Sequence, residues 1–179
     1  MSQQMEVAVL GGGCFWCLDA VYRQVRGVAS VETGYAGGQL ADPSHEQVAG
    51  GGTGHAQVVR LEFDPAIVSY HALLEVFFTS HDPTTPDRQG NDVGTQYRSA
   101  IFAQSPEQET TARQVIAEMA AVWDAPIVTQ VTPARPYYRA PDEQQNYVAH
   151  HPLQSYCALV VASMVDKFRA MHASLAKPA

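Results

Sequence analysis

The sequence predicts an α+β fold, a single-domain two-layer αβ sandwich with a mixed sheet and a long irregular C-terminal tail. Segments with the alternation of strands are mixed with segments that carry helical apolar stripes, without the strict alternation that is typical of a doubly wound sheet. The length of 179 residues suits one domain with one sizeable core, and the sequence contains no internal repeat or interdomain linker. We therefore expect residues 1–179 to form one domain.

The chain is expected to begin with a strand, a helix and a second strand. Residues 5–10 are an apolar run that stops at three glycines, as a strand entering a tight turn would. Residues 14–25 are predicted to follow as a helix that ends at Gly27. Residues 28–35 favour a strand, and the turn-rich stretch 36–55 predicts a long loop.

A third strand and a second helix are expected next. The alternation within residues 57–63 predicts a half-buried strand. Asp64 and Pro65 are expected to open a helix as its N-cap and first residue. The apolar stripe of this helix comprises Ile67, Tyr70, Leu74, Phe77 and Phe78. His71 lies on that stripe, so we expect a packed core histidine rather than a ligand.

The second half of the chain starts with a polar loop over 81–97 and a strand over 98–103. Ser105 and Pro106 predict the start of a further helix, because a cap is followed by an N1 proline. The core face of this helix is expected at Ala112, Val115, Ile116, Met119 and Ala120. Residues 126–132 are predicted to be the last strand, and the tail beyond is expected to become helical only near its end.

Charge and composition argue against several classes of protein. Eighteen acidic and eleven basic residues give a formal net charge of −7 without a basic stripe, which argues against a nucleic-acid or anionic-membrane surface. The sequence lacks a signal-peptide pattern and any run of about 18 apolar residues that could span a bilayer. We expect a soluble, cytoplasmic protein, in which three cysteines are too few for a disulfide framework.

The segment GGGCFWC, residues 11–17, permits four chemical interpretations. A structural zinc site needs about four ligands, and Cys157 has no cysteine neighbour to complete one. A redox Cys-x-x-Cys pair also occurs at helix starts. A single nucleophile is the third interpretation, because the helix dipole lowers the pKa of a cysteine in the first turn and Phe15 and Trp16 could wall a small apolar group. A buried structural cysteine is the fourth.

Several motifs together make the third interpretation specific. The sequence resembles a peptide methionine sulfoxide reductase of type A over about residues 7–167, and the resemblance rests on the order and spacing of GGGCFWC, GYAGG (34–38), TGHAQV (53–58), DVGTQYRSAIF (92–102) and SYC (155–157). We accordingly expect a ferredoxin-like core and one reductase-like catalytic domain. We expect no metal, because the lone Cys-x-x-Cys pair cannot supply four ligands. We also expect no bound cofactor and a monomer.

The resemblance further implies a thiol-dependent reduction of methionine S-sulfoxide, in proteins, in peptides or free. Cys14 matches the nucleophile, which would be left as a sulfenic acid. Cys157 matches a recycling cysteine on a mobile arm, and thioredoxin or another dithiol would reset the enzyme. Cys17 is either a relay or resolving thiol or a small buried side chain, because direct closure to Cys14 is expected to strain a regular first turn.

The resemblance also assigns the surrounding site residues. Phe15 and Trp16 match the pocket that holds the substrate methyl group. Asp92 and Tyr97 match a carboxylate and a phenol of the active site.

Three positions depart from the family pattern. Gln57 replaces the usual glutamate after GHA, and glutamine donates a hydrogen bond but cannot deliver a proton. His45 replaces the usual tyrosine and is either a substitute proton donor or an exposed loop residue. Glu143 and Gln144 replace a tyrosine and a histidine at the expected substrate rim. These changes leave open a family member with weakened activity, with other sulfoxide substrates, or with a sulfoxide-binding or thiol-sensing role.

Overall fold

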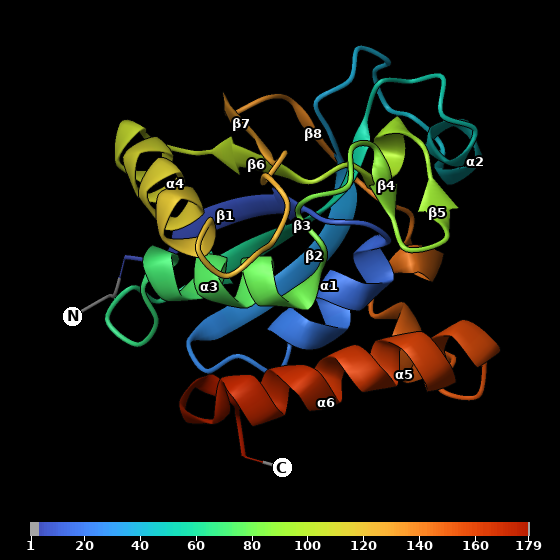
Figure 1. Cartoon of the computed structure of the whole chain (residues 1–179). Helices are drawn as coiled ribbons and strands as arrows, with labels where there is room; N and C mark the ends of the chain where they lie inside the picture. Colours follow the sequence, from blue (N-terminus) through green and yellow to red (C-terminus); the bar gives the residue numbers. More distant parts are fainter. Residues whose placement is uncertain (1–3, 179) are drawn as a thin grey trace.

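A six-stranded mixed sheet forms the centre of the fold, in the order β7-β6-β1-β3-β2-β8 (Figure 1). The structure is a computed structural model that describes residues 4–178. The strands are β1 (Glu6–Gly11), β2 (Val28–Ala36), β3 (Ala56–Phe63), β6 (Ala100–Ala103), β7 (Gln130–Pro133) and β8 (Tyr137–Arg139). Strands β6 and β7 pair in parallel, and the other neighbours are antiparallel. The prediction of an α+β fold with a mixed sheet is confirmed.

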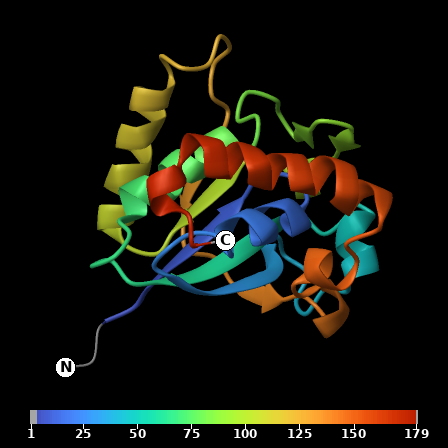
Figure 2. The same ribbon diagram turned by 90° about the horizontal axis from the view of Figure 1, so that it is seen from below.

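The four inner strands and two helices form the expected ferredoxin-like core. Helix α1 (Phe15–Tyr22) connects β1 to β2, and α3 (Tyr70–Ser80) lies between β3 and β6. The inner strand order β6-β1-β3-β2 completes the βαββαβ pattern. Helices α1 and α3 lie on one face of the sheet, where α6 (Ala162–Met171) crosses them (Figures 1 and 2). The main core lies between these helices and the sheet, and its largest buried side chains include Tyr22, Phe63, Phe77 and Phe78.

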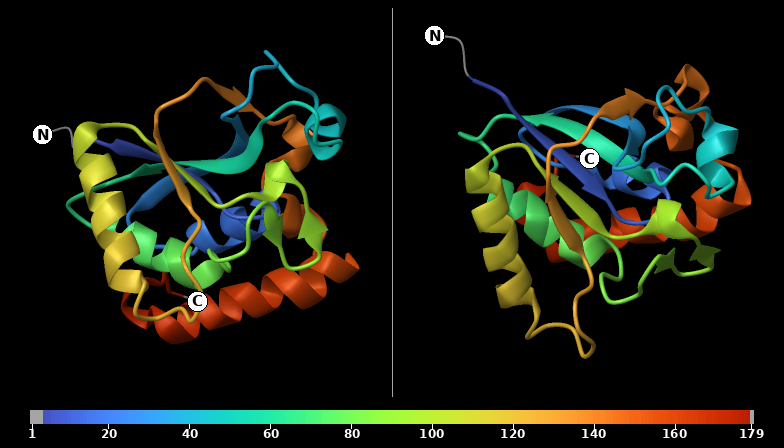
Figure 3. Two further views of the ribbon diagram at one scale, coloured as in Figure 1. Left: turned by 45° about the horizontal axis from the view of Figure 1, so that its top comes forward. Right: turned by 90° about the horizontal axis from the view of Figure 1, so that it is seen from above.

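The sheet is strongly rolled. Strands β7 and β8 lie at opposite edges, yet only residues 134–136 connect them. Such a connection spans at most about 14 Å between its flanking Cα atoms, whereas five strand spacings in a flat sheet measure about 24 Å. The connection therefore crosses the inner face of a half-barrel (Figure 3). Small residues such as Ala36, Ala56 and Ala100 form a second cluster of buried side chains with Val58 and Phe102.

The second predicted helix begins later than the sequence indicated. Asp64 does not cap a helix; its Oδ1 accepts a hydrogen bond from the Ala66 N–H at 2.9 Å and forms a turn. Ser69 caps α3 instead, by accepting from the Ala72 N–H at 3.0 Å. Ile67 consequently lies outside the helix and is 57% exposed. An aspartate–proline pair is compatible with both a cap and a turn, and the later serine provides the cap here.

His71 was wrongly predicted to be a core histidine. Its side chain is 35% exposed and lies between two carboxylates, with Nδ1 3.2 Å from Glu75 and Nε2 2.8 Å from Glu118. Glu118 belongs to α4 (Pro106–Met119), whose predicted Ser105 cap is confirmed by a bond from the Gln108 N–H. His71 thus joins two helices at the surface.

Short elements occupy segments predicted as loops. Helix α2 (His45–Ala49) begins at a capping box of Ser44 and Gln47. A hairpin of β4 (Arg88–Gln89) and β5 (Asp92–Val93) is followed by the 3₁₀ turn η1 (Thr95–Tyr97). Strand β7 covers only the end of the segment predicted as a strand, and β8 follows it. These elements are too short for periodicity to reveal them.

The C-terminal segment contains more regular structure than the sequence predicted. Its elements are η2 (Asp142–Gln144), α5 (Tyr147–His150), the π-helical turn η3 (Cys157–Val161), α6 and η4 (Ala173–Leu175). Phe168 of α6 is 2% exposed and belongs to the main core. The helical end expected from the sequence is confirmed. In residues 4–178, no helix has both the length and the hydropathy required to span a bilayer.

The stability of the fold should depend on pH through His81. This buried side chain joins the Phe77 carbonyl (2.6 Å) to the Ser99 hydroxyl (2.8 Å), and burial lowers its pKa to about 4. In the unfolded chain the His81 imidazole takes up a proton near pH 6.5, whereas in the folded protein it does so only near pH 4. The stability that neutral His81 contributes to the fold is therefore complete above pH 6.5 and is lost as the pH falls toward 4. We expect a loss of about 3 kcal/mol over this range, measured by urea unfolding.

His81→Gln is the matched control, because a carboxamide can make both hydrogen bonds but does not titrate. This variant should show a shallower decline in stability between pH 7 and 4. Equal declines in both proteins would assign the acid sensitivity to other groups.

Candidate active site

The site lies at one end of the inner strands, where β1 ends and β3 begins. Gly11 pairs with Ala100, and Tyr35 pairs with Gln57, so the relevant ends of four strands meet there. Gly12 packs closely against His81, because a Cβ atom at position 12 would lie 3.0 Å from the His81 ring. This close approach lies where the chain passes from β1 into α1.

Cys14 and Cys17 occupy defined positions at the start of α1. Cys14 is the N-cap, with an extended backbone (φ −62°, ψ 127°), and it is partly exposed. Cys17 is the third helical residue and is 4% exposed. Both are free thiols, and the Cys17 N–H donates to the Cys14 carbonyl at 3.1 Å.

The pKa of Cys14 differs from the sequence-based expectation. A side-chain hydrogen bond with Cys17, together with burial, raises the pKa of Cys14 well above its usual value, although the Trp16 N–H acts in the opposite direction. The helix start was expected to lower this pKa, but the neighbouring thiol and burial outweigh it. Cys14 therefore carries its proton in the resting site.

A cavity of about 340 Å³ and a smaller one of about 220 Å³ both open at Cys14. The smaller cavity is lined by Cys14, Trp16, His45, Gln57, Asp92, Tyr97 and Tyr156. Six of these seven residues were predicted as site residues. Segments far apart in the sequence thus form one pocket around Cys14.

Phe15 and His45 form a stacked layer beside this pocket. Phe15 is fully buried and does not line the cavity, whereas Trp16 does. The Phe15 ring stacks on His45 with centroids 5.8 Å apart, and His45 Nδ1 lies 2.9 Å from the Tyr35 hydroxyl. His45 is therefore held in the site and is not a free loop residue, and burial lowers its pKa.

Gln57 points inward, as its strand position predicted. It is 3% exposed, and its Oε1 accepts a hydrogen bond from the Phe15 N–H at 3.2 Å. This bond satisfies one of the amides that the start of a helix leaves without a partner. With the oxygen engaged, the NH₂ group of Gln57 is the donor that remains for a ligand in the pocket.

Tyr156 connects the polar groups of the site. Its hydroxyl donates to Asp92 Oδ2 at 3.4 Å and lies 3.2 Å from the Cys17 sulfur. Burial raises the pKa of Asp92, and burial and Asp92 raise that of Tyr97. Tyr156 was not among the predicted site residues, although the SYC motif contains it.

The rim of the pocket is built around Trp16. The Tyr147 ring stacks on the indole with centroids 3.8 Å apart and an interplanar angle of 2°. The indole N–H donates to Gln144 Oε1 at 3.0 Å. Gln144, which departs from the family pattern, thus holds Trp16 in place, while Glu143 is exposed. Sequence reasoning missed Tyr147, because no local pattern predicts this long-range stack.

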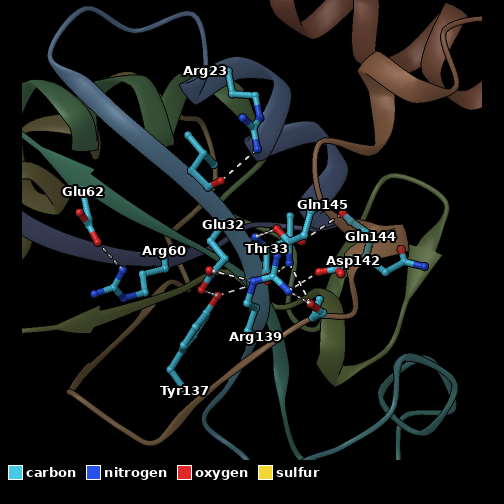
Figure 4. Close-up of polar contacts among 12 residues, drawn as sticks. Arg23, Glu32, Thr33, Arg60, Glu62, Tyr137, Arg139, Asp142, Gln144 and Gln145 are labelled. Carbon is cyan, nitrogen blue, oxygen red and sulfur yellow. Dashed lines mark hydrogen bonds and ion pairs between the residues drawn. The ribbon is translucent and has the colours of Figure 1, made fainter.

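The rim segment is fixed to β2 by the polar cluster drawn in Figure 4. The Gln145 side chain accepts from the Thr33 N–H and donates to the Thr33 carbonyl, both at 2.9 Å, as a neighbouring strand would. Arg139 joins Glu32 at 3.0 Å and Asp142 at 2.7 Å. This cluster sets the position from which Gln144 and Tyr147 reach Trp16.

Cys157 lies in ordered structure. It is the first residue of η3 and 2% exposed, and its thiol donates to Gln154 Oε1 at 3.3 Å. The larger cavity lies between the two cysteines of α1, residues 89–92, and the side chains of Tyr156, Val160 and Met164. Cys157 does not line either cavity.

The family model for peptide methionine sulfoxide reductase matches residues 6–176. The chain belongs to this family. Of the residues expected from the sequence, Cys14, Trp16, His45, Gln57, Asp92 and Tyr97 line the smaller pocket, whereas Phe15, Cys17 and Cys157 do not.

Relatives in other organisms extend this assignment. A protein named peptide methionine sulfoxide reductase MsrA from Ralstonia nicotianae is 57% identical over 93% of this chain and 91% of its own. Its namesake in Polynucleobacter asymbioticus is 53% identical over 97% and 93%. Among solved structures, reduced Mxr1 from Saccharomyces cerevisiae has a TM-score of 0.82 at 31% identity, covering 86% of this chain and 90% of Mxr1. Methionine sulfoxide reductase A of Corynebacterium diphtheriae has a TM-score of 0.76 at 34% identity, covering 84% and 76%.

Proposed function

We propose that this protein reduces methionine S-sulfoxide, in proteins, in peptides or free, to methionine with electrons from a dithiol. The observation that carries the proposal is the pocket of about 220 Å³ that places Cys14 beside Trp16 and the donors Gln57 and Tyr97. The volume suits a side chain, and the indole offers an apolar face to its methyl group. The family membership supports the same reaction.

Cys14 is the proposed nucleophile. Its sulfur attacks the sulfoxide sulfur and takes up the oxygen, which leaves methionine and a sulfenic acid on Cys14. The raised pKa of Cys14 means that the thiol brings the proton that the sulfoxide oxygen needs. A second thiol, Cys157 or Cys17, then captures the sulfenic acid as a disulfide with loss of water. Cys14 would therefore need a partner thiol in every turnover.

Gln57, Tyr97, Asp92 and His45 are the proposed polar groups around the sulfoxide oxygen. Gln57 and Tyr97 donate hydrogen bonds, and Asp92 orients Tyr156. The Tyr35 hydroxyl lies 2.9 Å from His45 Nδ1, and we propose that it donates to this nitrogen, so that the neutral ring carries its proton on Nε2. Neutral His45 can therefore donate from Nε2, in the place of the tyrosine that the family usually has.

Thioredoxin is the proposed physiological dithiol, because two electrons must be supplied by exchange after each turnover. Mxr1 has also been solved in complex with Trx2. The net charge of −7 supports a protein that binds neither nucleic acid nor membrane, and we infer a cytoplasmic location.

Methionine formation from each sulfoxide epimer, with dithiothreitol as reductant, tests the proposed function. We expect turnover of the S epimer and at least a hundredfold lower rate for Cys14→Ser, because the nucleophile is removed. Tight binding of sulfoxide without turnover in the wild type would favour the alternative of a sulfoxide-binding protein.

Gln57→Glu should raise turnover roughly tenfold or more, because a buried, protonated carboxyl can keep the bond from Phe15 and also act as a general acid. The rate constant for methionine formation is the measurement. Gln57→Ala, which lacks both groups, is the control and should be slower than the wild type. A Glu variant no faster than the wild type would place the acid function elsewhere.

His45 should affect the pH dependence below its ordinary pKa of about 6.5, because burial lowers its pKa. The ratio of the wild-type rate to that of His45→Tyr should be constant above pH 6.5 and rise as pH falls below it, since the protonated ring is the stronger donor. Rates measured between pH 5 and 8 test this. A constant ratio throughout would remove His45 from proton donation.

A further inference from the structure

We propose that Gln89 is a positioning residue of the reaction, whose side chain holds Asp92 and Tyr97 in place beside Cys14. This inference deepens the proposed function and rests on it. Asp92 and Tyr97 line the smaller pocket together with Cys14. Gln89 lines the larger cavity and not the smaller one, so it acts on the sulfoxide through the residues that it holds.

The hairpin that carries Asp92 and Tyr97 is too short to hold its own position. Strands β4 and β5 contain two residues each, and Gln89 lies directly opposite Asp92. A two-stranded hairpin is at best marginally stable on its own. Strand β5 leads through Gly94 into η1, which ends at Tyr97. The position of both site residues therefore depends on what attaches this hairpin to the core.

The side chain of Gln89 makes this attachment. Its Oε1 accepts a hydrogen bond from the Asp82 N–H at 3.0 Å, and its Nε2 donates to the Asp82 carbonyl at 3.0 Å. Asp82 follows the buried His81, which is the C-cap of α3. Both ends of the carboxamide are thus bonded to one backbone residue at the end of a core helix.

Other contacts of this segment act elsewhere. The Gly94 N–H donates to the Asp87 carbonyl at 2.8 Å, which closes the hairpin on itself. Gln96 Nε2 donates to the Ala49 carbonyl at 2.9 Å, which joins η1 to α2. The attachment of the hairpin to the end of α3 is therefore left to Gln89.

Gln89 also packs against the residue before Cys14. Gly13 has a φ of +92°, and a Cβ atom at this position would lie 2.6 Å from Gln89 Cγ and 2.9 Å from Gln89 Cβ. The stem of Gln89 therefore lies directly on the Gly13 backbone, which only glycine permits in this conformation. One side chain thus contacts the turn that leads into Cys14 and belongs to the residue opposite Asp92.

This arrangement should affect the chemical step more than substrate binding. Polar groups stabilise a transition state when they are held in position beforehand, and a displacement of about 1 Å can lower the rate about 100-fold. The indole of Trp16, which would contact the methyl group, is held separately by Gln144 and Tyr147. Loss of the Gln89 amide should therefore lower kcat and leave KM similar.

Gln89→Met tests the inference, because methionine keeps an unbranched stem against Gly13 and removes both hydrogen bonds to Asp82. With methionine S-sulfoxide and dithiothreitol, we expect kcat to fall about 10- to 100-fold and KM to change by less than about threefold. The Gly94 amide should also exchange with solvent faster than in the wild type, because the hairpin opens more often.

Gln108→Met is the matched control. Gln108 also bonds both ends of its amide to backbone groups, since it accepts from the Gln104 N–H at 2.9 Å and donates to the Val7 carbonyl at 2.8 Å. It belongs to α4 and lines neither cavity at Cys14. Stability to urea should fall in both variants, while kcat of Gln108→Met should stay within about twofold of the wild type.

A double-mutant cycle separates positioning from general damage to the fold. In a protein that carries Asp92→Ala and Tyr97→Phe, the further effect of Gln89→Met on kcat should shrink to less than about threefold, because the groups that Gln89 positions are absent. Gln89→Asn, which keeps the amide on a shorter stem, gives the same comparison if Gln89→Met does not fold.

Three results would overturn the inference. They are equal losses of kcat in the Gln89 and Gln108 variants, an unchanged exchange rate of the Gly94 amide in Gln89→Met, and an undiminished effect of Gln89→Met in the double-variant background. Any of them with an active wild type contradicts only this inference. A wild type that forms no methionine contradicts the proposed function, and the inference fails with it.

Discussion

The site depends on one hydrogen bond, from the Phe15 N–H to the side chain of Gln57. A helix start leaves amides without partners, and a buried amide without a partner costs about 1–3 kcal/mol. Gln57 of β3 satisfies one of them and thereby joins the sheet to α1 at the residue after Cys14. A carboxyl at the same position could make this bond as well. The replacement of the family's glutamate therefore preserves the architecture of the site and removes a titratable proton.

A second constraint comes from the C-terminal segment. The side-chain amide of Gln145 binds β2 through both its oxygen and its NH₂ group. Gln144 and Tyr147 then hold the indole of Trp16. The apolar wall of the pocket is thus positioned by residues about 130 positions later in the chain. Strand β8, which pairs with β2, joins this segment to the half-barrel.

Local chemistry explains how much the sequence could predict. The core strands, the Ser105 cap and the inward direction of Gln57 each depend on residues close in sequence, and the structure agrees with them. The predicted helix start at Asp64 was wrong, because an aspartate–proline pair is compatible with both a helix cap and a turn. The raised pKa of Cys14 and the role of Tyr156 depend on tertiary contacts, which the periodicity of the sequence cannot reveal.

Tyr156 forms part of the wall of both cavities at Cys14. A ligand that moved this ring in one cavity would also change the shape of the other cavity. By linkage, the two effects must have the same free energy in both directions. A bound sulfoxide and a group in the larger cavity would therefore be thermodynamically coupled through side chains that line both cavities, which are Cys14, Asp92 and Tyr156.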